Sequence, residues 1–324
     1  MRCLCCGKDE SDFIFDSEAG WHKKCIRSFF GTKEIPYIDL SDKTFEALAM
    51  ENTNNGYTVP GVQKKLSLHL DVEDRPRLTL MNYPTGYILK PQVEDFNAMP
   101  ESEQLVMSMA EGCGISTVPH ALVKLQIGQL AYITKRVDRK TVRGGKTEMY
   151  AMEDFCQLDL RLTGDKYRGA YERCAKIIIQ YSSRSGLDLS ELYLRLIFSF
   201  LTGNSDMHLK NFSLIETSER SGQYTLSPAY DLLPVNLLMP EDKEQFALTM
   251  NGKKSNLRRS DFLTYAENCG IKETAAVKML DSMISKQKFF HEAIEKSWIP
   301  DEMKSEFKVM LDNRITSLSD KTKR

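Results

Sequence analysis

The feature that most constrains the fold is a polar run at 203–213, which follows an apolar segment at 189–201. The apolar segment carries large side chains at helical spacing, so it predicts a buried helix that ends where the polar run begins. Past the run, residues 212–226 have two short apolar stretches around a polar turn, the pattern of a β-hairpin. A helix, a polar loop and a hairpin are therefore expected in direct succession, with Asp231 just beyond them.

Three residues of this region have the spacing and chemistry of a phosphoryl-transfer site. Asp206 and Asn211 stand five apart, as in the D-x-x-x-x-N loop of protein kinases, and Asp231 lies twenty residues further on. Such a site needs one carboxylate for the proton of the attacking hydroxyl and oxygen ligands for Mg²⁺. We interpret Asp206 as the base, Asn211 as a metal ligand and Asp231 as the principal metal ligand. The alternative is that all three are solvated loop residues, because the spacing alone is common.

Composition excludes several classes of protein. The chain of 324 residues carries a net charge of −1 from 44 basic and 45 acidic residues, which argues against a protein that grips nucleic acid by its phosphates. No run of eighteen apolar residues is present, so we expect no membrane span. The N-terminus lacks the apolar stretch of a signal peptide. We therefore expect a cytoplasmic protein, in which cysteines more often bind metal than form disulfides.

The N-terminus contains two ligand pairs typical of structural zinc. Cys3-x2-Cys6 and His22-x2-Cys25 supply three thiolates and an imidazole, a closed tetrahedral set for Zn²⁺. Such a site would hold a short segment that cannot fold by apolar burial alone. Cys5 is an alternative to Cys3 or Cys6, and free cysteines near a frayed terminus are the alternative to a metal site.

A Pro-Gly turn around Gly61 precedes a strand that alternates from Lys65 to Leu70. Backbone N–H groups in such a turn can fold over phosphates because no Cβ blocks them. An ordinary hairpin turn explains this stretch equally well.

Lys90 ends an apolar strand and is followed by a helix-like segment at 101–111. A lysine at this place in a kinase pairs with a helix carboxylate, which aims the ammonium at the α- and β-phosphates of ATP. We predict Glu103 as the partner, with Glu101 as its competitor.

Two strands at 121–125 and 130–134 lead to a charged run, where a hinge between lobes is expected. Backbone groups of Arg136 and Val137 would read an adenine edge there, and Asp138 would reach a ribose hydroxyl; a solvated charged run is the alternative. The predicted division is a zinc-ribbon-like segment at 1–40, a β-rich N-lobe at 41–138 and a helical C-lobe at 139–324. Helices are expected, among others, at 152–160, 171–182 and within 259–320.

Five motifs, in order, resemble the HipA family of bacterial toxin kinases from about residue 50 to the C-terminus. They are Thr-Val-Pro-Gly-Val-Gln-Lys-Lys at 58–65, Ile-Leu-Lys-Pro at 88–91, Met-Glu-Asp-Phe-Cys-Gln at 152–157, Gly-Asn-Ser-Asp-Met-His-Leu-Lys-Asn-Phe at 203–212 and Pro-Ala-Tyr-Asp at 228–231. The resemblance implies an α+β, protein-kinase-like bilobal fold and a serine/threonine kinase that uses ATP and Mg²⁺. It also implies the toxin of a toxin–antitoxin pair that phosphorylates an aminoacyl-tRNA synthetase. The expected partner is a helix-turn-helix, HipB-like antitoxin, through which alone the chain would meet nucleic acid.

Carried over residue by residue, the resemblance makes Asp206 the catalytic aspartate and Lys90 the phosphate-binding lysine. Asn211 and Asp231 match the family's magnesium ligands, and His208 would touch the nucleotide or Asp206. Lys210 belongs to the same motif and is expected to serve catalysis. The residues expected to cover the phosphates are Thr58, Gly61, Val62, Gln63 and Lys65. Thr58 stands where the family has a self-phosphorylated serine, so self-inhibition by an added charge is expected to remain available.

Two departures from the family concern contacts more than chemistry. The family's further N-terminal subdomain is missing here, as in split systems where a separate small protein supplies it, and a zinc-ribbon-like segment stands in front instead. Two other functions stay open from the residues alone. Asp-x-His-x-x-Asn also resembles the loop of phosphoinositide kinases, which favours a lipid or small-molecule substrate, and a pseudokinase that acts by binding would keep the same fold.

Overall fold

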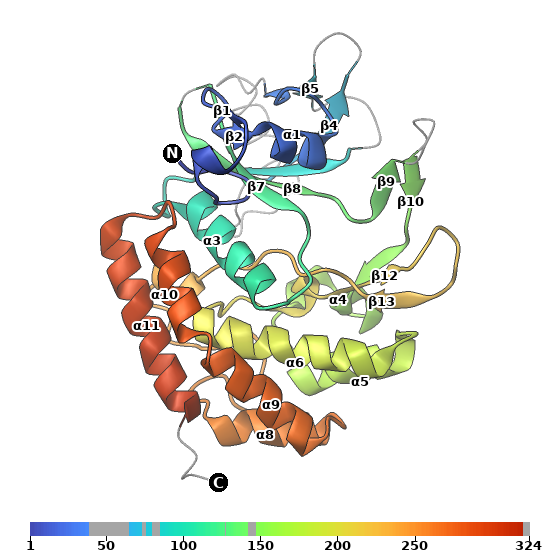
Figure 1. Ribbon diagram of the computed structural model, residues 1–324. Helices are drawn as coiled ribbons and strands as arrows, with labels where there is room; N and C mark the ends of the chain where they lie inside the picture. Colours follow the sequence, from blue (N-terminus) through green and yellow to red (C-terminus); the bar gives the residue numbers. More distant parts are fainter. Residues whose placement is uncertain (39–64, 73–75, 80–84, 127, 142–146, 320–324) are drawn as a thin grey trace. The chain divides into compact units, whose positions relative to one another are not determined.

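The computed structural model describes residues 1–38, 65–72, 76–79, 85–126, 128–141 and 147–319. The predicted phosphate-covering residues Thr58, Gly61, Val62 and Gln63 lie outside these ranges, whereas Lys65 lies inside them and is exposed. The chain forms two compact units (Figure 1). The first comprises Met1–Gln104 and Val118–Arg136, and the second comprises Leu105–Thr117 and Val137–Arg324. The last of the three crossings between the units, at Arg136–Val137, lies two residues before the predicted hinge boundary at Asp138.

The first unit is built on a six-stranded sheet with the order β3-β5-β4-β6-β8-β7. β3 and β5 are parallel, and every other neighbouring pair is antiparallel. The predicted hairpin of β7 and β8 is confirmed. The strands are β3 (Tyr37–Ile38), β4 (Leu66–Asp71), β5 (Arg77–Thr79), β6 (Tyr87–Pro91), β7 (His120–Lys124) and β8 (Leu130–Lys135).

The N-terminal segment packs on this sheet instead of forming a separate body. Leu122 in the edge strand β7 donates its N–H to the Leu4 carbonyl at 3.0 Å. Its carbonyl accepts the indole N–H of Trp21, also at 3.0 Å. The segment thereby covers backbone groups that an edge strand would otherwise expose. Its elements are the 3₁₀ turn η1 (Glu10–Asp12), β1 (Phe15–Asp16), β2 (Trp21–His22) and α1 (Lys23–Phe30).

Helix α3 (Met99–Gly112) begins in the first unit and ends in the second. Its middle turns are apolar and fully buried, with Val106 and Met109 at 0% exposure. This burial explains why the predicted helix at 101–111 forms, although its local pattern does not indicate that its two ends belong to different units.

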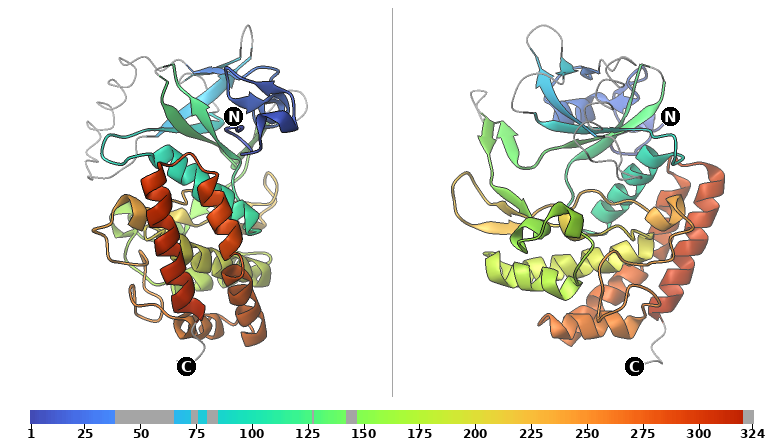
Figure 2. Two further views of the ribbon diagram at one scale, coloured as in Figure 1. Left: turned by 60° about the vertical axis from the view of Figure 1, so that its left-hand side comes forward. Right: turned by 180° about the vertical axis from the view of Figure 1, so that it is seen from behind.

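The second unit is mainly helical and is built around the apolar α6, against which α5, α9 and α11 pack (Figure 1). α10 and α11 lie side by side (Figure 2). The helices are α4 (Phe155–Leu158), α5 (Tyr171–Tyr181), α6 (Ser185–Thr202), α7 (Val235–Leu238), α8 (Arg259–Asn268), α9 (Glu273–Ile284), α10 (Gln287–Glu295) and α11 (Asp301–Ser319). The other elements are β9 (Arg139–Thr141), β10 (Thr147–Met149), β11 (Met152–Asp154), β12 (Ser213–Glu216), β13 (Tyr224–Leu226) and the 3₁₀ turns η2 (Thr163–Asp165) and η3 (Leu209–Asn211). The predicted hairpin is β12–β13.

The helix predicted at 152–160 is wrong in its first part. Residues Met152–Asp154 form a strand that pairs with β12, and only the four residues of α4 are helical. Asp154 accepts the Gln157 N–H at 2.9 Å, and the Gln157 side chain accepts the Asp154 N–H. This capping box starts the helix at Phe155. Pairing with a distant strand thus overrode the local helical pattern.

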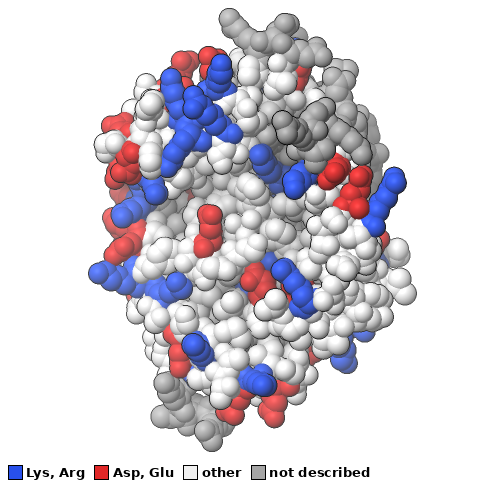
Figure 3. All heavy atoms as spheres, turned by 45° about the vertical axis from the view of Figure 1, so that its right-hand side comes forward, with Lys and Arg blue, Asp and Glu red and all other residues white. Residues whose placement is uncertain are grey.

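Across the described ranges, no helix is both long and apolar enough to cross a bilayer. On the face in Figure 3, acidic and basic side chains stand in small neighbouring groups. This agrees with the mixed charge of the sequence.

Candidate functional site

The polar loop begins at Gly203, which ends α6 in a left-handed conformation with a φ of 75°. A Cβ at this position would lie 2.8 Å from the Met310 sulfur in α11, so both the backbone conformation and the packing favour glycine. The tight turn directs the loop away from the helix axis, and the loop then closes with the 3₁₀ turn η3.

Asp206 and Asn211 are joined within this loop. The Asn211 side-chain N–H₂ donates to the Asp206 backbone carbonyl at 2.9 Å. Asn211 is buried, so this bond fixes the amide and leaves its carbonyl oxygen as the atom that can bind a metal ion. The carboxylate of Asp206 is half-buried, and its Oδ1 accepts the hydroxyl proton of Tyr167 at 2.8 Å.

Asp231 follows the β12–β13 hairpin with a φ of 61°, an uncommon conformation for an aspartate. Its charge acts on Asp206: burial raises the pKa of Asp206 to about 6, and repulsion from Asp231 adds to the rise, while the hydrogen bond from Tyr167 opposes it. Carboxylate and amide oxygens gathered in this way are the ligands that a hard cation prefers. Asp231 and Asn211 therefore fit Mg²⁺, which would offset the repulsion between the two carboxylates.

His208 lies between the two functional positions of the loop. Its ring is buried and meets Tyr167 edge to face, with 5.0 Å between ring centroids. Burial, together with the positive charge of Lys166, lowers the pKa of His208 to about 4. Within the described part of the chain, the buried Nδ1 has no hydrogen-bond partner. A neutral imidazole with an open polar atom is thus available to a bound group.

Lys210, predicted to serve catalysis, is engaged elsewhere. Its ammonium contacts Asp154 Oδ2 at 2.6 Å, so it ties the loop to the start of α4. The ion pair is partly exposed, with 33% of the Lys210 side chain accessible. This ion pair holds the loop in the structure, and the catalytic role of Lys210 stays a prediction.

Lys166 and Tyr167, which the sequence reasoning missed, also belong to this site. They lie between η2 and α5, about forty residues before Asp206, in a stretch without periodicity or a recognised motif. The Lys166 carbonyl accepts the N–H of Leu209, and the Tyr167 hydroxyl reaches Asp206. Only the folded chain brings them together, so no sequence signal could have identified them.

In the first unit, Lys90 in β6 pairs with Glu103 in α3. The ammonium lies 2.7 Å from Glu103 Oε1, and both side chains are buried. The ring of Tyr132 lies 5.5 Å from the same ammonium. The partner is the predicted Glu103 and not its competitor Glu101, whose pKa is raised by burial. A buried pair of this kind fixes the direction of the lysine.

Of the predicted hinge residues Arg136, Val137 and Asp138, Arg136 has its backbone N–H in a hydrogen bond within the first unit. The N–H of Arg136 donates to the Gly86 carbonyl at 2.9 Å, so the sheet uses the group that was expected to read an adenine. Val137 and Asp138 belong to the second unit. There the Asp138 carbonyl accepts the Tyr150 N–H at 2.8 Å, and its carboxylate lies 3.7 Å from Arg139 Nε.

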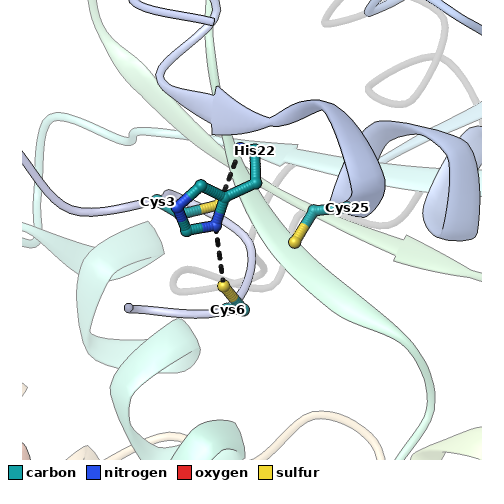
Figure 4. Close-up of side chains that lie close together, drawn as sticks. All are labelled: Cys3, Cys6, His22 and Cys25. Atoms are coloured by element: carbon teal, nitrogen blue, oxygen red, sulfur yellow. Dashed lines mark hydrogen bonds between the residues drawn. The ribbon is translucent and has the colours of Figure 1, made fainter. Parts of the chain in front are cut away.

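Cys3, Cys6, His22 and Cys25 converge near the start of α1 (Figure 4). Their ligand atoms all lie within 4.8 Å of one another, and tetrahedral zinc would separate two sulfurs by about 3.8 Å. His22 Nδ1 lies 3.4 Å from Cys6 Sγ, while Nε2 lies 2.9 Å from the Asp9 carbonyl. Metal-binding histidines hold their second nitrogen in this manner. The group contains Cys3 and Cys6 and does not need Cys5.

The Cys3 sulfur accepts the backbone N–H of His22 at 3.2 Å. The pKa of Cys3 is lowered to about 5, chiefly by a hydrogen bond from the Cys6 side chain. The hydrogen bond to Cys3 raises the pKa of Cys6, and burial raises that of Cys25. The fit to Zn²⁺ therefore rests on the geometry and on the residue types, three sulfurs and one imidazole within reach of a single ion.

Comparison with known proteins identifies the family. The profile of the HipA-like C-terminal domain matches residues 57–289, well over half of the chain. The chain belongs to the HipA-like C-terminal domain family. A candidate kinase of Haemophilus influenzae is 26% identical over 294 residues, with 82% of each chain covered. A candidate kinase of Sinorhizobium fredii is 29% identical, with 74% of this chain and 60% of the relative covered.

Solved structures agree with this assignment. HipA from the Shewanella oneidensis toxin–antitoxin complex of HipA, HipB and operator DNA has a TM-score of 0.69 at 18% identity, covering 81% of this chain and 65% of that one. The proinflammatory kinase CtkA of Helicobacter pylori has a TM-score of 0.53 at 15% identity, covering 78% of this chain and 94% of CtkA. The predicted α+β kinase-like fold is thereby confirmed, and the chain is a HipA-family kinase.

Proposed function

We propose that this HipA-family kinase transfers the γ-phosphoryl group of ATP to a serine or threonine of a protein, with Mg²⁺ as the metal. The gathering of Asp206, Asn211 and Asp231 around one loop of the second unit is the observation that carries the proposal. The buried Lys90–Glu103 pair of the first unit supports it, because kinases hold ATP phosphates with such a pair.

Each residue has a defined task in this reaction. Asp206 orients the acceptor hydroxyl and takes up its proton as the oxygen attacks. Asp231 and the Asn211 carbonyl oxygen would hold Mg²⁺, and Lys90 would bind the α- and β-phosphates of ATP. His208 would offer its unpaired Nδ1 to the nucleotide. When bound, ATP would supply the phosphoryl group and Mg²⁺ would offset the negative charge on the phosphate oxygens.

The class of acceptor is tested with labelled ATP. Cell lysate freed of its own kinases by heating is incubated with the purified chain and ATP labelled in the γ-phosphate. We expect labelled protein bands whose hydrolysate contains phosphoserine or phosphothreonine. Label only in the lipid or small-molecule fraction would contradict a protein substrate and favour a phosphoinositide-kinase-like reaction.

We propose further that the chain is the toxin of a toxin–antitoxin pair, with a helix-turn-helix, HipB-like protein as its antitoxin. The likeness to HipA of the Shewanella complex supports this. An aminoacyl-tRNA synthetase is the proposed target, a separate small protein is a further proposed partner, and Thr58 is the proposed site of self-phosphorylation. Growth arrest by the wild-type chain, relieved by the neighbouring helix-turn-helix gene, is the expected result. Equal arrest by an Asp206→Ala variant would contradict a catalytic toxin.

We propose that Cys3, Cys6, His22 and Cys25 bind one structural Zn²⁺. All four positions of a tetrahedral ion are taken by the protein, so this metal would take no part in phosphoryl transfer. Elemental analysis of the purified chain should give one zinc per molecule, and a Cys25→Ser variant should give far less. Equal zinc in both would contradict the assignment.

A further inference from the structure

We propose that Tyr167 is a positioning residue that holds the Asp206 carboxylate in the orientation needed for phosphoryl transfer. The proposal rests on the kinase function proposed above, and it assigns a task to a residue outside the motifs of the catalytic loop.

The hydrogen bond between these two residues fixes the carboxylate. The Tyr167 hydroxyl donates to Asp206 Oδ1 at 2.8 Å, so Oδ1 is occupied and the carboxylate cannot rotate freely. Oδ2 then remains the oxygen that meets the acceptor hydroxyl. Orientation of this kind matters because a small misplacement of a catalytic group costs a large part of its effect.

The ring of Tyr167 is itself held in place. It stands at 76° to the buried ring of His208, with 5.0 Å between the centroids. The Lys166 ammonium also contacts this ring and lies 4.9 Å from its centroid. A hydroxyl on a ring fixed in this way loses little further freedom when it forms its hydrogen bond.

The backbone around Tyr167 is anchored to the catalytic loop at two points. On one side, the Lys166 carbonyl accepts the Leu209 N–H at 3.1 Å. On the other, the buried Tyr171 donates its hydroxyl to the Met207 carbonyl at 3.0 Å. We call residues 166–171 the strap. Because the strap is bonded to the loop before and after Tyr167, it moves with Asp206 and keeps the hydroxyl in register with the carboxylate.

The test uses the hydrolysis of Mg-ATP by the purified chain, in which water replaces the unidentified acceptor. Tyr167→Phe removes the hydroxyl and keeps the ring. We expect kcat to fall about tenfold, the order expected for the loss of one hydrogen bond to a charged group. The KM for ATP should change less than about twofold, because the hydroxyl bonds to Asp206 and is not among the residues assigned to nucleotide binding.

A matched control is Tyr181→Phe at the end of α5, since Tyr181 is 43% exposed and Tyr167 is 45% exposed. It should leave kcat and KM unchanged. A double-mutant cycle provides the decisive readout: in an Asp206→Asn background, Tyr167→Phe should have no further effect, because the group it positions has lost its function.

Three results would overturn the assignment. Wild-type kcat in Tyr167→Phe would show that the bond is idle. An equal loss in the Asp206→Asn background would show a structural effect unrelated to Asp206. Phosphate found on Tyr167 itself would make the hydroxyl an acceptor and not a support. Absence of hydrolysis by the wild-type chain would instead defeat the proposed function, and this assignment with it.

Discussion

Asp231 shows how the fold sets the properties of a single functional residue. Its φ is 61°. The preceding residue, Tyr230, is fixed by hydrogen bonds of its hydroxyl to Ser213 and to the Lys210 carbonyl, which helps to hold this conformation. The charge of Asp231 raises the pKa of Asp206, so the two carboxylates lie close enough to interact. Backbone strain at such a position is common in functional sites.

The first prediction concerns the metal-binding role of Asp231. Asp231→Asn removes a negative charge and keeps a residue that tolerates the left-handed conformation. We expect ATP turnover to fall more than about 100-fold, since metal-assisted charge stabilisation is worth several kcal/mol. The affinity for Mn²⁺ in the presence of ATP, measured by electron paramagnetic resonance, should fall as well.

The melting temperature of Asp231→Asn should stay close to that of the wild type, because Asp231 lies in a loop. Asp301→Asn, at the exposed start of α11, is the control and should change neither turnover nor Mn²⁺ affinity. Undiminished Mn²⁺ binding by Asp231→Asn would refute its assignment as a metal ligand.

At the scale of elements, the N-terminal segment is attached to both elements that carry the Lys90–Glu103 pair. Phe29 and Phe30 in α1 pack on Tyr87 in β6, the strand that carries Lys90. The Cys5 carbonyl lies 3.5 Å from the amide nitrogen of Gln104, the neighbour of Glu103 in α3. The N-terminal segment therefore supports the sheet and the helix that hold the ion pair.

The second prediction follows from this attachment. Removal of zinc by a chelator, or by Cys25→Ser, should lower the melting temperature of the chain by more than about 5 °C, because the segment depends on the metal for its fold. It should also weaken ATP binding, measured by calorimetry. Cys113→Ser lies outside the metal group and should be neutral. Unchanged stability after complete removal of zinc would contradict a structural metal.

The third prediction concerns pH and the junction of α3 with β7. His120 is buried and lies 2.8 Å from Gln104 Oε1, and burial lowers its pKa to about 4. Above the unfolded pKa of about 6.5 the imidazole is neutral in both states, so it adds no pH dependence. As the pH falls below 6.5, the unfolded chain binds the proton and the folded chain does not, so stability falls until about pH 4.

Between pH 7 and pH 5, His120 should therefore remove roughly 2 kcal/mol of unfolding free energy. Urea unfolding at pH 7 and pH 5 gives the fall in unfolding free energy between the two values. This fall should be about 2 kcal/mol smaller in His120→Asn than in the wild type. The same pH dependence in both proteins would mean that His120 becomes protonated in the folded state.

The local elements could be predicted from the sequence, whereas several contacts could not. Some features depend on residues close together in the chain, so the local sequence pattern was enough to predict them. These are the buried helix α6, the hairpin β12–β13 and the spacing of the cysteine and histidine pairs. Three other features depend on partners more than thirty residues away. They are the strand β11, the hydrogen bond from Tyr167 to Asp206 and the hydrogen bond from the Arg136 N–H to the Gly86 carbonyl. Nothing in a local pattern reports such partners.

At the scale of the whole molecule, the residues assigned to the proposed kinase reaction are found in both units. The second unit carries the acidic loop and its strap, and the first carries the lysine pair together with the metal-binding segment. Within its described ranges the chain passes between the two units three times, inside α3 at 104–105, at 117–118 and at 136–137. The proposed reaction needs residues of both units, so a measurement of turnover tests the account of the whole molecule.

The most direct test of the central claim is the release of labelled phosphate from γ-labelled ATP by the wild-type chain and by Asp206→Ala, with Mg²⁺ or with EDTA. The account predicts turnover by the wild type in Mg²⁺ alone, and a loss of at least about 100-fold in Asp206→Ala at unchanged melting temperature. Turnover that persists in EDTA, or that is equal in Asp206→Ala, would contradict it.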